Sequence, residues 1–411
     1  MILAQNHRLQ LNGNKFLIVL CCIITLGACS PKVVQKKEPV TIPVVKPEKT
    51  EDLNNFTQAE VSILVPFKLN EFNPNTVTKK QFEKFEMPLD FYQGLTYGFD
   101  SAANLGLNFK LNVFDTRDNN TRLGALLQNN IIKKSNLIIG PVFPDGLKYV
   151  TNFSIANDLP VVSPLAASKP SEFNNPNLIS IVNDIDQHGI KIADYIAKHY
   201  NAANSIVVLI NTQKALDKQF ADPIKETFKK RYPNFLIQEY ASVNIFETKM
   251  IRDKKYAVII CSQDVPFVTP SIAKLYKLKT LPNTGYQINL FGHPNWVKQN
   301  YNIEQLQNLN TIISSSYFVD YKSTEVVNFV KRYRAKYQVE PTEYAFKGFD
   351  IGFYFGKLMV KYGRNYLDFI RKEKYKGLHN DFEFDFNPLY GYYNKSLMLL
   401  QYRNLMLNVI D

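Results

Sequence analysis

The sequence has little cysteine, one tryptophan and no apolar run of membrane-spanning length. Of the four cysteines among 411 residues, three lie in the first 29 positions and only Cys261 occurs later. The main part of the chain therefore has no pair for an intramolecular disulfide, and we expect its core alone to stabilise it. Cys261 ends the apolar segment Ala257–Cys261, which predicts an inert core thiol.

The sequence also lacks the short motifs of common enzymes and metal sites. Gly-x-Ser-x-Gly, a Walker loop, His-Glu-x-x-His and Cys-x-x-Cys are all absent. The formal charge is +12, or about +10 without Arg8 and Lys15, but the lysines are scattered and no aromatic–basic RNA-binding motif occurs. We therefore expect no catalysis, no metal or other cofactor and no nucleic-acid partner.

The N-terminal segment has the pattern of an export signal. Arg8 and Lys15 precede Phe16–Leu26, an apolar run of 11 residues, whereas a spanning helix needs roughly 20. Leu26-Gly27-Ala28-Cys29 then matches a lipobox, with small residues before a thiol that accepts lipid. We predict a signal peptide over 1–28 and lipid attachment at Cys29. The alternative is a short buried helix followed by an ordinary cysteine.

A tether is predicted over 29–59, because this stretch is rich in proline and lysine. Proline fixes φ and withholds a backbone donor, so the segment should be extended. The membrane would then be a partner through the lipid on Cys29. Ser30 and the basic residues after it favour attachment to the outer membrane, facing the periplasm.

From residue 60 onward, short apolar runs alternate with amphipathic segments, which predicts parallel sheets covered by helices. The first set of expected strands is 61–67, 109–115, 137–140 and 159–163, with helices at 88–105, 119–133 and 146–157. The second set has strands at 205–210, 235–240, 256–261, 288–292 and 311–314, and helices at 186–200, 214–231 and 270–279.

The C-terminal part should complete both sets. We expect helices at 323–337 and 342–362, then strands at 382–386 and 397–410, with turns at Asn387-Pro388 and Asn394-Lys395. Gly348, Gly352 and Gly356 are spaced by four, which usually permits close helix packing. The fold class is thus α/β, two doubly wound parallel-sheet lobes joined by a multi-strand hinge. We place 60–184 plus 317–375 in lobe one and 185–316 plus 376–411 in lobe two.

Over residues 60–411 the sequence resembles the type 1 periplasmic-binding-protein family, whose branched-chain amino-acid receptors feed ABC transporters. The segments that carry the resemblance are VPF (65–67), FYQGLTYGFDSA (91–102), VFDTRDN (113–119), LIIGPVFP (137–144), LPVVSPLAAS (159–168) and FEFDFNPLYGYYNKSLMLLQY (382–402). LFGHPNW (290–296) and YAFKGFDIGFYFG (344–356) look closest to a Bacteroidetes lipoprotein branch related to members with a lysin motif, a domain with no counterpart here. Lipoprotein activators of peptidoglycan synthases share the fold.

The ligand-binding cleft should lie at the carboxyl ends of the strands, between the lobes. Backbone N–H groups at 166–168, with the hydroxyl of Ser163 or Ser168, could hold a carboxylate; alternatively, serine caps a helix starting near Ser171. The cleft candidates in the two lobes are Phe67, Pro141, Val142, Phe143, Ser163, Leu165, Ala166, Ala167, Ser168, Thr212, His293 and Trp296.

Two functions from different classes remain open at this stage. The first is a solute-binding lipoprotein that closes two lobes on a small polar ligand. The loop Gly292–Trp296 has no acid where amino-acid receptors place one, which makes a zwitterionic ligand doubtful because an unpaired buried ammonium is costly. Trp296 either stacks on a ligand ring or packs in its own lobe. The second is a ligand-free scaffold or regulator of a peptidoglycan-synthesis or other envelope complex.

Overall fold

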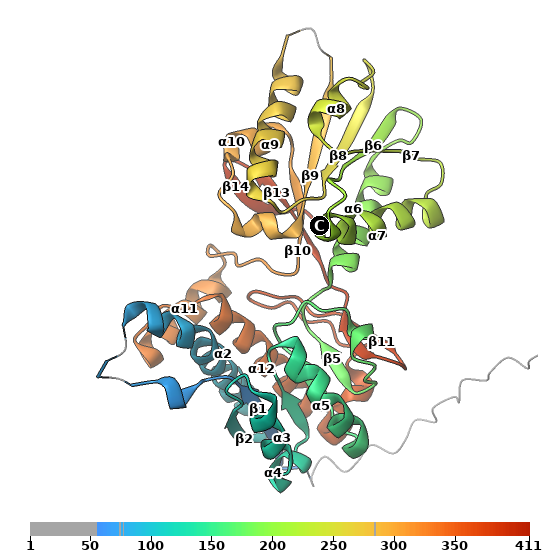
Figure 1. Ribbon diagram of the computed structural model, residues 1–411. Helices are drawn as coiled ribbons and strands as arrows, with labels where there is room; N and C mark the ends of the chain where they lie inside the picture. The colour runs from blue at the N-terminus through green and yellow to red at the C-terminus, as the bar shows by residue number, and fades with distance from the viewer. Residues whose placement is uncertain (1–55, 74, 77, 283–284) are drawn as a thin grey trace, which may run out of the picture. The chain divides into compact units, whose positions relative to one another are not determined.

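The computed structural model describes residues 56–411, apart from 74, 77 and 283–284 (Figure 1). The predicted signal peptide, Cys29 and the tether up to residue 55 lie outside the described residues. No described helix is both long enough and apolar enough to cross a bilayer.

The described strands form two mixed sheets of seven strands each. The first has the order β11-β12-β5-β4-β3-β1-β2, and the second β14-β13-β10-β9-β8-β6-β7. The strands of the first are β1 (Gln58–Val65), β2 (Asn108–Asp115), β3 (Leu137–Ile139), β4 (Val161–Ser163), β5 (Leu178–Ser180), β11 (Phe384–Asn387) and β12 (Gly391–Asn394). Those of the second are β6 (Ser205–Ile210), β7 (Leu236–Tyr240), β8 (Lys255–Ile260), β9 (Gln287–Gly292), β10 (Ile312–Ser315), β13 (Met398–Arg403) and β14 (Met406–Val409).

Burial of the central strands explains why they are parallel. All six residues of β6 are buried, and so are five of the six residues of β8. A strand covered on both faces is uniformly apolar, and that coverage is typical of parallel sheets flanked by helices. β11, β13 and β14 add antiparallel pairs at the sheet edges. The predicted α/β fold with two lobes is confirmed.

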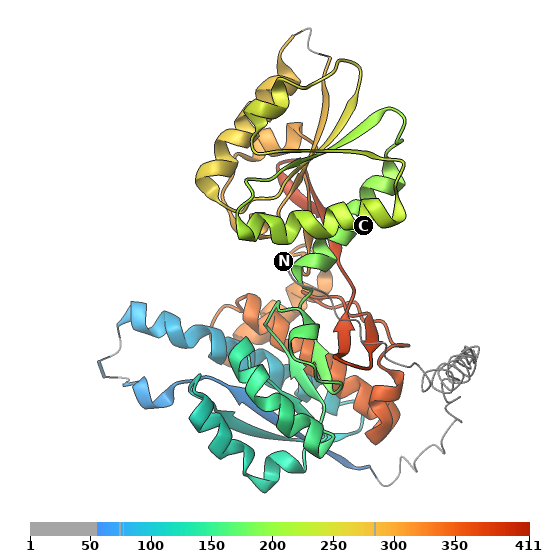
Figure 2. The same cartoon turned by 45° about the vertical axis from the view of Figure 1, so that its right-hand side comes forward.

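Helices flank both sheets, and we call each sheet with its helices a lobe (Figures 1 and 2). The longer segments of lobe one are α2 (Lys79–Ala103), α3 (Asn120–Leu127), α4 (Asn130–Lys133), α5 (Pro144–Asn157), α11 (Thr324–Tyr337), α12 (Glu343–Tyr362) and the 3₁₀ segment η5 (Gly363–Phe369); η2 (Leu69–Glu71) and η3 (Pro170–Glu172) are single turns. Lobe two has α6 (Ile185–His199), α7 (Ala215–Arg231), α8 (Val243–Glu247), α9 (Val265–Thr280), α10 (Ile303–Asn308) and the 3₁₀ segment η4 (Pro294–Lys298).

The helices α2 and α12 approach each other at glycine. A Cβ atom at Gly348 would overlap the backbone carbonyl oxygen of Phe91, and one at Gly352 would overlap that of Leu95. The close packing expected from the glycine spacing is therefore present. It buries Phe91, Leu95 and Phe355 in the core of lobe one.

The chain passes between the lobes after β5, after β10 and after β12. Asn394 lies at the last of these crossings, where its Nδ2 donates to the carbonyls of Asp381 (2.9 Å) and Ile181 (3.2 Å). Its own carbonyl accepts from the side chains of Asn183 (2.8 Å) and Gln187 (2.9 Å). One asparagine thus links segments from two of the three crossings.

The hairpin β11–β12 differs from the predicted lobe boundary. We had placed 376–411 in lobe two, but β12 pairs in parallel with β5 of the first sheet, and only β13 and β14 join the second. The third crossing therefore comes after residue 394. The predicted turn at Asn387-Pro388 is present, because β11 and β12 form an antiparallel pair around it.

Candidate functional site

A cavity of about 350 Å³ is lined by residues of both lobes. Most of its lining follows the carboxyl ends of strands, as expected for a doubly wound sheet. The lining residues that precede or open lobe two's first helix are Leu165, Ala167, Val182, Asn183, Ile185 and His188. The others are Leu216, Gln219, Gln263, His293, Pro294, Asn295, Lys298, Ser315, Ser316, Tyr317, Lys347 and Asn380.

Three of the predicted cleft residues, Leu165, Ala167 and His293, line this cavity. Pro141, Val142 and Phe143 instead line a separate cavity of about 10 Å³, together with residues such as Thr116 and Gly146. The chain turns sharply after β3, where Gly140 has a φ of 95°, and enters α5 at Pro144.

The other predicted residues lie outside the cavity lining. Ser163 and Ala166 are buried, Phe67 packs edge-on against Tyr92 with 5.6 Å between ring centroids, and Ser168 is half-buried. Thr212 donates its hydroxyl to Asp217 at 2.6 Å. The alternative prediction, that a serine caps a helix starting near Ser171, is also not seen. The 3₁₀ segment η3 begins after Lys169, and no side chain caps it.

Trp296 packs within lobe two. Its side chain is fully buried, its Nε1 donates to the carbonyl of Ser262 at 2.9 Å, and its ring meets Tyr301 edge-on at 5.2 Å. Between the two alternatives for this residue, the burial and the satisfied indole N–H favour core packing over stacking on a ligand. Cys261 is likewise buried, and burial raises the pKa of its thiol well above the ordinary value.

Two histidines form one wall of the cavity, the histidine wall. His188 Nδ1 lies 2.9 Å from the Ser314 hydroxyl and its Nε2 lies 3.3 Å from that of Ser316. His293 Nδ1 accepts from the backbone N–H of Asn295 at 3.1 Å and so caps η4. Burial lowers the pKa of His188 to about 3, with a contribution from His293, and that of His293 to about 4. Both rings are therefore neutral near pH 7.

A second polar group of the lining, which we call the lysine end, consists of Tyr317, Lys298 and Lys347. The ammonium of Lys298 lies 5.6 Å from the centroid of the Tyr317 ring, and that of Lys347 lies 5.1 Å from it. Lys298 also forms an ion pair with Glu343 at 2.9 Å. His379 stacks on the Tyr317 ring, with 4.5 Å between the ring centroids and 10° between the ring planes.

A buried carboxylate holds the loop that supports the lysine end. Asp350 accepts backbone N–H groups of Leu378 (2.8 Å), His379 (2.8 Å) and Asn380 (3.0 Å), and the Tyr375 hydroxyl at 3.1 Å. Burial raises the pKa of Asp350 to about 6, and these hydrogen bonds oppose the shift. Asn380 in turn donates to the Ser316 carbonyl at 2.9 Å, which connects the loop to the end of β10.

The lining of the cavity contains no aspartate or glutamate within the described part of the chain. Nor do the described residues contain a group of three or more His, Cys, Asp or Glu side chains arranged to hold a metal ion. The chemistry available in the cavity is therefore hydrogen bonding, two ammonium groups and apolar contact.

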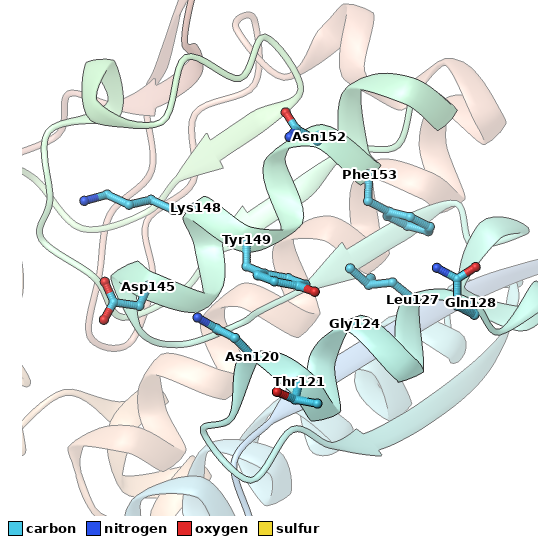
Figure 3. Close-up of a pocket in the computed structure, with 10 residues that line it drawn as sticks. All are labelled: Asn120, Thr121, Gly124, Leu127, Gln128, Asp145, Lys148, Tyr149, Asn152 and Phe153. Carbon is cyan, nitrogen blue, oxygen red and sulfur yellow. The ribbon is translucent and has the colours of Figure 1, made fainter.

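A second depression, the α3–α5 groove, lies on lobe one (Figure 3). Its volume is about 920 Å³, and the residues lining it come from α3, from Gln128 directly after α3, and from α5. Tyr149 lies across it from Gly124, where a Cβ atom would come 2.5 Å from the tyrosine hydroxyl. Tyr149 is 46% exposed, so an aromatic ring is available on this surface.

Sequence reasoning missed His188, Tyr317, Asn183 and both lysines of the site. Lys347 had a usable signal, because it is the one charged residue between Ala345 and Phe349 in an otherwise apolar helical segment. Such a lysine lies beside the core and is a candidate for a polar site. Tyr317 and Asn183 had no comparable signal, since both come from loops at the crossings.

Comparison with known proteins identifies the fold of this chain. No protein-family model matches the sequence, and no curated protein matches it either. Solved structures do match: the chain has the type 1 periplasmic binding protein fold. One is a branched-chain amino acid ABC transporter protein from Rhodospirillum rubrum, with 14% identity, TM-score 0.60, and coverage of 86% of this chain and 100% of that one.

Two further structures show the range of proteins that share this fold. A substrate-binding protein from Desulfitobacterium hafniense in complex with Leu has 12% identity and a TM-score of 0.54, over 86% of this chain and 100% of that one. The C-domain of LpoA from Haemophilus influenzae, a regulator of PBP1A, has 14% identity and a TM-score of 0.54, with the same coverage. At these identities the likeness establishes the fold only.

Proposed function

We propose that this chain is a non-enzymatic cell-envelope lipoprotein that binds a small polar solute between its two lobes. The observation that carries the proposal is the cavity at the carboxyl ends of the strands. Its volume of about 350 Å³ falls in the usual range for small-molecule sites, roughly 300–1,000 Å³. Most of its lining residues are polar or charged, and the others are apolar or aromatic, which suits a small polar solute.

Binding can be tested by thermal unfolding of the purified chain with a broad library of small polar solutes. A ligand at a hundredfold excess over Kd should add about 2.7 kcal/mol to the free energy of unfolding. Ala167→Trp, which fills the cavity, should abolish the shift. Ala156→Trp, at an exposed position of α5, is the matched control and should keep it. Absence of any shift across the library would count against solute binding.

The membrane attachment belongs to the same proposal. We propose that the lipid on Cys29 anchors the chain to the outer membrane on its periplasmic side. The lipobox and the proline-rich tether support this, and both lie outside the described residues. Cys29→Ser should prevent incorporation of radiolabelled palmitate and move the chain from the membrane fraction to the periplasmic fraction. Retention of the label in that variant would refute the assignment.

A second candidate is an interaction scaffold or regulator of a peptidoglycan-synthesis or other envelope complex. The α3–α5 groove favours it, since it presents an exposed Tyr149 beside open space. The shared fold with the LpoA C-domain is compatible with it. Crosslinking in native membranes should then yield one stoichiometric envelope protein, and Tyr149→Ala should reduce its yield. A solute receptor should give no such partner and should be unaffected by that change.

A further inference from the structure

The charged side chains that line the cavity are all positive, and this limits the kind of solute that the proposed binding site would take. Lys298 and Lys347 are the charged residues among the lining residues. The histidine wall adds no charge near pH 7, because burial keeps His188 and His293 neutral. The lining thus presents two positive groups together with neutral hydrogen-bonding groups.

The two lysines differ in how their charge is compensated. Lys298 is paired with Glu343 at 2.9 Å and is largely exposed. Lys347 is partly buried, and no carboxylate among the described residues lies within ion-pair distance of its ammonium. Its neighbours are the rings of Tyr317 at 5.1 Å and Tyr344 at 5.4 Å. Ring faces attract a cation, but they do not replace a full counter-charge.

The remaining titratable groups around Lys347 do not supply that counter-charge. Glu343 is already paired, and His379 is buried and uncharged, since burial and the positive charge of Lys347 lower its pKa to about 3. Burial also lowers the pKa of Lys347 itself, with Glu343 opposing the shift and Lys298 adding to it. An ammonium that is partly withdrawn from water and lacks a partner is stabilised by an incoming anion.

A second, independent observation points to a ligand in the same cavity. Asn183 is 1% exposed and lines the cavity, and its Oδ1 is buried with no hydrogen-bond partner among the described residues. Its Nδ2 donates to the Asn394 carbonyl at 2.8 Å, which fixes the orientation of the amide. A buried acceptor without a partner costs free energy until a donor reaches it.

We propose that the solute is a small organic acid that carries a hydroxyl or amide donor and no ammonium group. This proposal rests on the solute-binding function proposed above. Its acidic group binds at the ammonium of Lys347 beside Tyr317, and its donor meets Oδ1 of Asn183. A zwitterionic amino acid does not fit, because the lining has no carboxylate to pair with its ammonium. Carboxylates and phosphate monoesters share the required chemistry.

The test begins with capture from a small-molecule extract of bacterial cells. The full purified chain is incubated with the extract, washed and denatured, and the released solutes are identified by mass spectrometry. Enrichment of an acid without an amine supports the proposal, and its class separates carboxylates from phosphate esters. Enrichment of a zwitterion or neutral solute overturns the proposal but leaves solute binding intact. If nothing is enriched from the extract, solute binding and this proposal both fail.

Variants then locate the acid. Lys347→Met keeps the length of the side chain and removes its charge, and it should weaken binding of the captured acid about tenfold or more. Lys357→Met is the matched control, because Lys357 is exposed on the same helix, and its affinity should be unchanged. Lys347→Arg should restore part of the affinity. An unchanged Kd for Lys347→Met in a folded chain overturns the assignment.

Discussion

The two lobes share one strand order, although β12 runs parallel to β5 in lobe one and β13 runs antiparallel to β10 in lobe two. They differ in how their helices pack. In lobe one, α2 and α12 touch backbone to backbone through glycines, so that the contact depends on the absence of side-chain atoms. In lobe two, large side chains such as Trp296, Phe220 and Phe246 fill the space between sheet and helices. The α2–α12 contact of lobe one is therefore sensitive to added atoms, whereas the large buried side chains, which lobe one also contains, are sensitive to removed ones.

The lobes also differ in the ionisable groups that they bury. Lobe one buries Asp350 and His379, and burial raises the pKa of the carboxyl to about 6 and lowers that of the ring to about 3. Lobe two buries His188 and His293, and burial lowers the pKa of both rings. Acid should consequently affect the buried carboxyl of lobe one and the buried histidines in opposite directions.

The largest expected effect is in lobe two. Trp296→Ala removes a fully buried indole and the hydrogen bond to Ser262, which should cost about 3–5 kcal/mol. Trp296→Phe keeps most of the volume and should cost less. Urea unfolding of the full chain measures both. Equal and small losses for the two variants would show that the indole does not hold this core together.

The corresponding change in lobe one adds a single methyl group. Gly348→Ala should destabilise by about 1–3 kcal/mol, because its Cβ meets the rigid carbonyl of Phe91. Gly124→Ala in α3 is the matched control: its nearest neighbour is the hydroxyl at the end of Tyr149, and the gain in helix propensity is about 1 kcal/mol. If both variants gained stability, the close contact of α2 and α12 would be refuted.

The dependence of stability on pH should have opposite signs for the buried histidines and for Asp350. A neutral buried histidine binds fewer protons than the unfolded chain, so its contribution to stability is lost as pH falls from about 6.5 towards 4 and 3. Asp350 binds more protons when folded, so its contribution is lost as pH rises from 3.8 to about 6. Each group changes the free energy by up to about 1.4 kcal/mol per pH unit.

Two variants assign these contributions. In urea unfolding between pH 4 and 7.5, His188→Gln should reduce the loss of stability in acid, whereas Asp350→Asn should make the net loss steeper. The unchanged chain at each pH is the reference. Identical pH profiles for the three proteins would contradict the opposite contributions of the buried histidine and the buried carboxyl.

The smallest expected effect is the loss of a helix N-cap, which should destabilise both lobes by the same amount. Ser323 caps α11 in lobe one by accepting from Val326 at 3.2 Å, and Ser242 caps α8 in lobe two by accepting from Ile245 at 3.3 Å. Replacing either serine by alanine should cost about 1 kcal/mol. Thermal unfolding of the two variants should give matching shifts, since a cap is local and does not depend on how its lobe is packed.

The elements most visible in the sequence are those set by local pattern. The apolar runs of β6 and β8 and the amphipathic α6 agree with prediction to within about two residues. β5 was missed because only Leu178–Ser180 form it, next to Asn-Pro, and three residues carry too little periodicity. α8 is similarly short, and the tyrosines of β12 gave no strand alternation.

The site was less predictable, because it depends on contacts between distant segments. The loop after β4 was correctly expected near a cavity, and Leu165 and Ala167 line one. The loop after β3 was expected there too, yet it turns towards α5. His188 and Lys347 are 159 positions apart. The chain crosses between the lobes after β10, and there the Asp350-bound loop is joined to the end of that strand by the hydrogen bond from Asn380 to the Ser316 carbonyl.

The three crossings have a consequence for the order in which the chain is made. The first sheet needs β12, which lies more than 200 residues after its neighbour β5, so the ribosome must complete almost the whole chain before that sheet can close. Lobe two likewise receives β13 and β14 last. During elongation, both sheets therefore expose an unpaired edge, and a nascent chain of this design depends on protection until its final strands emerge.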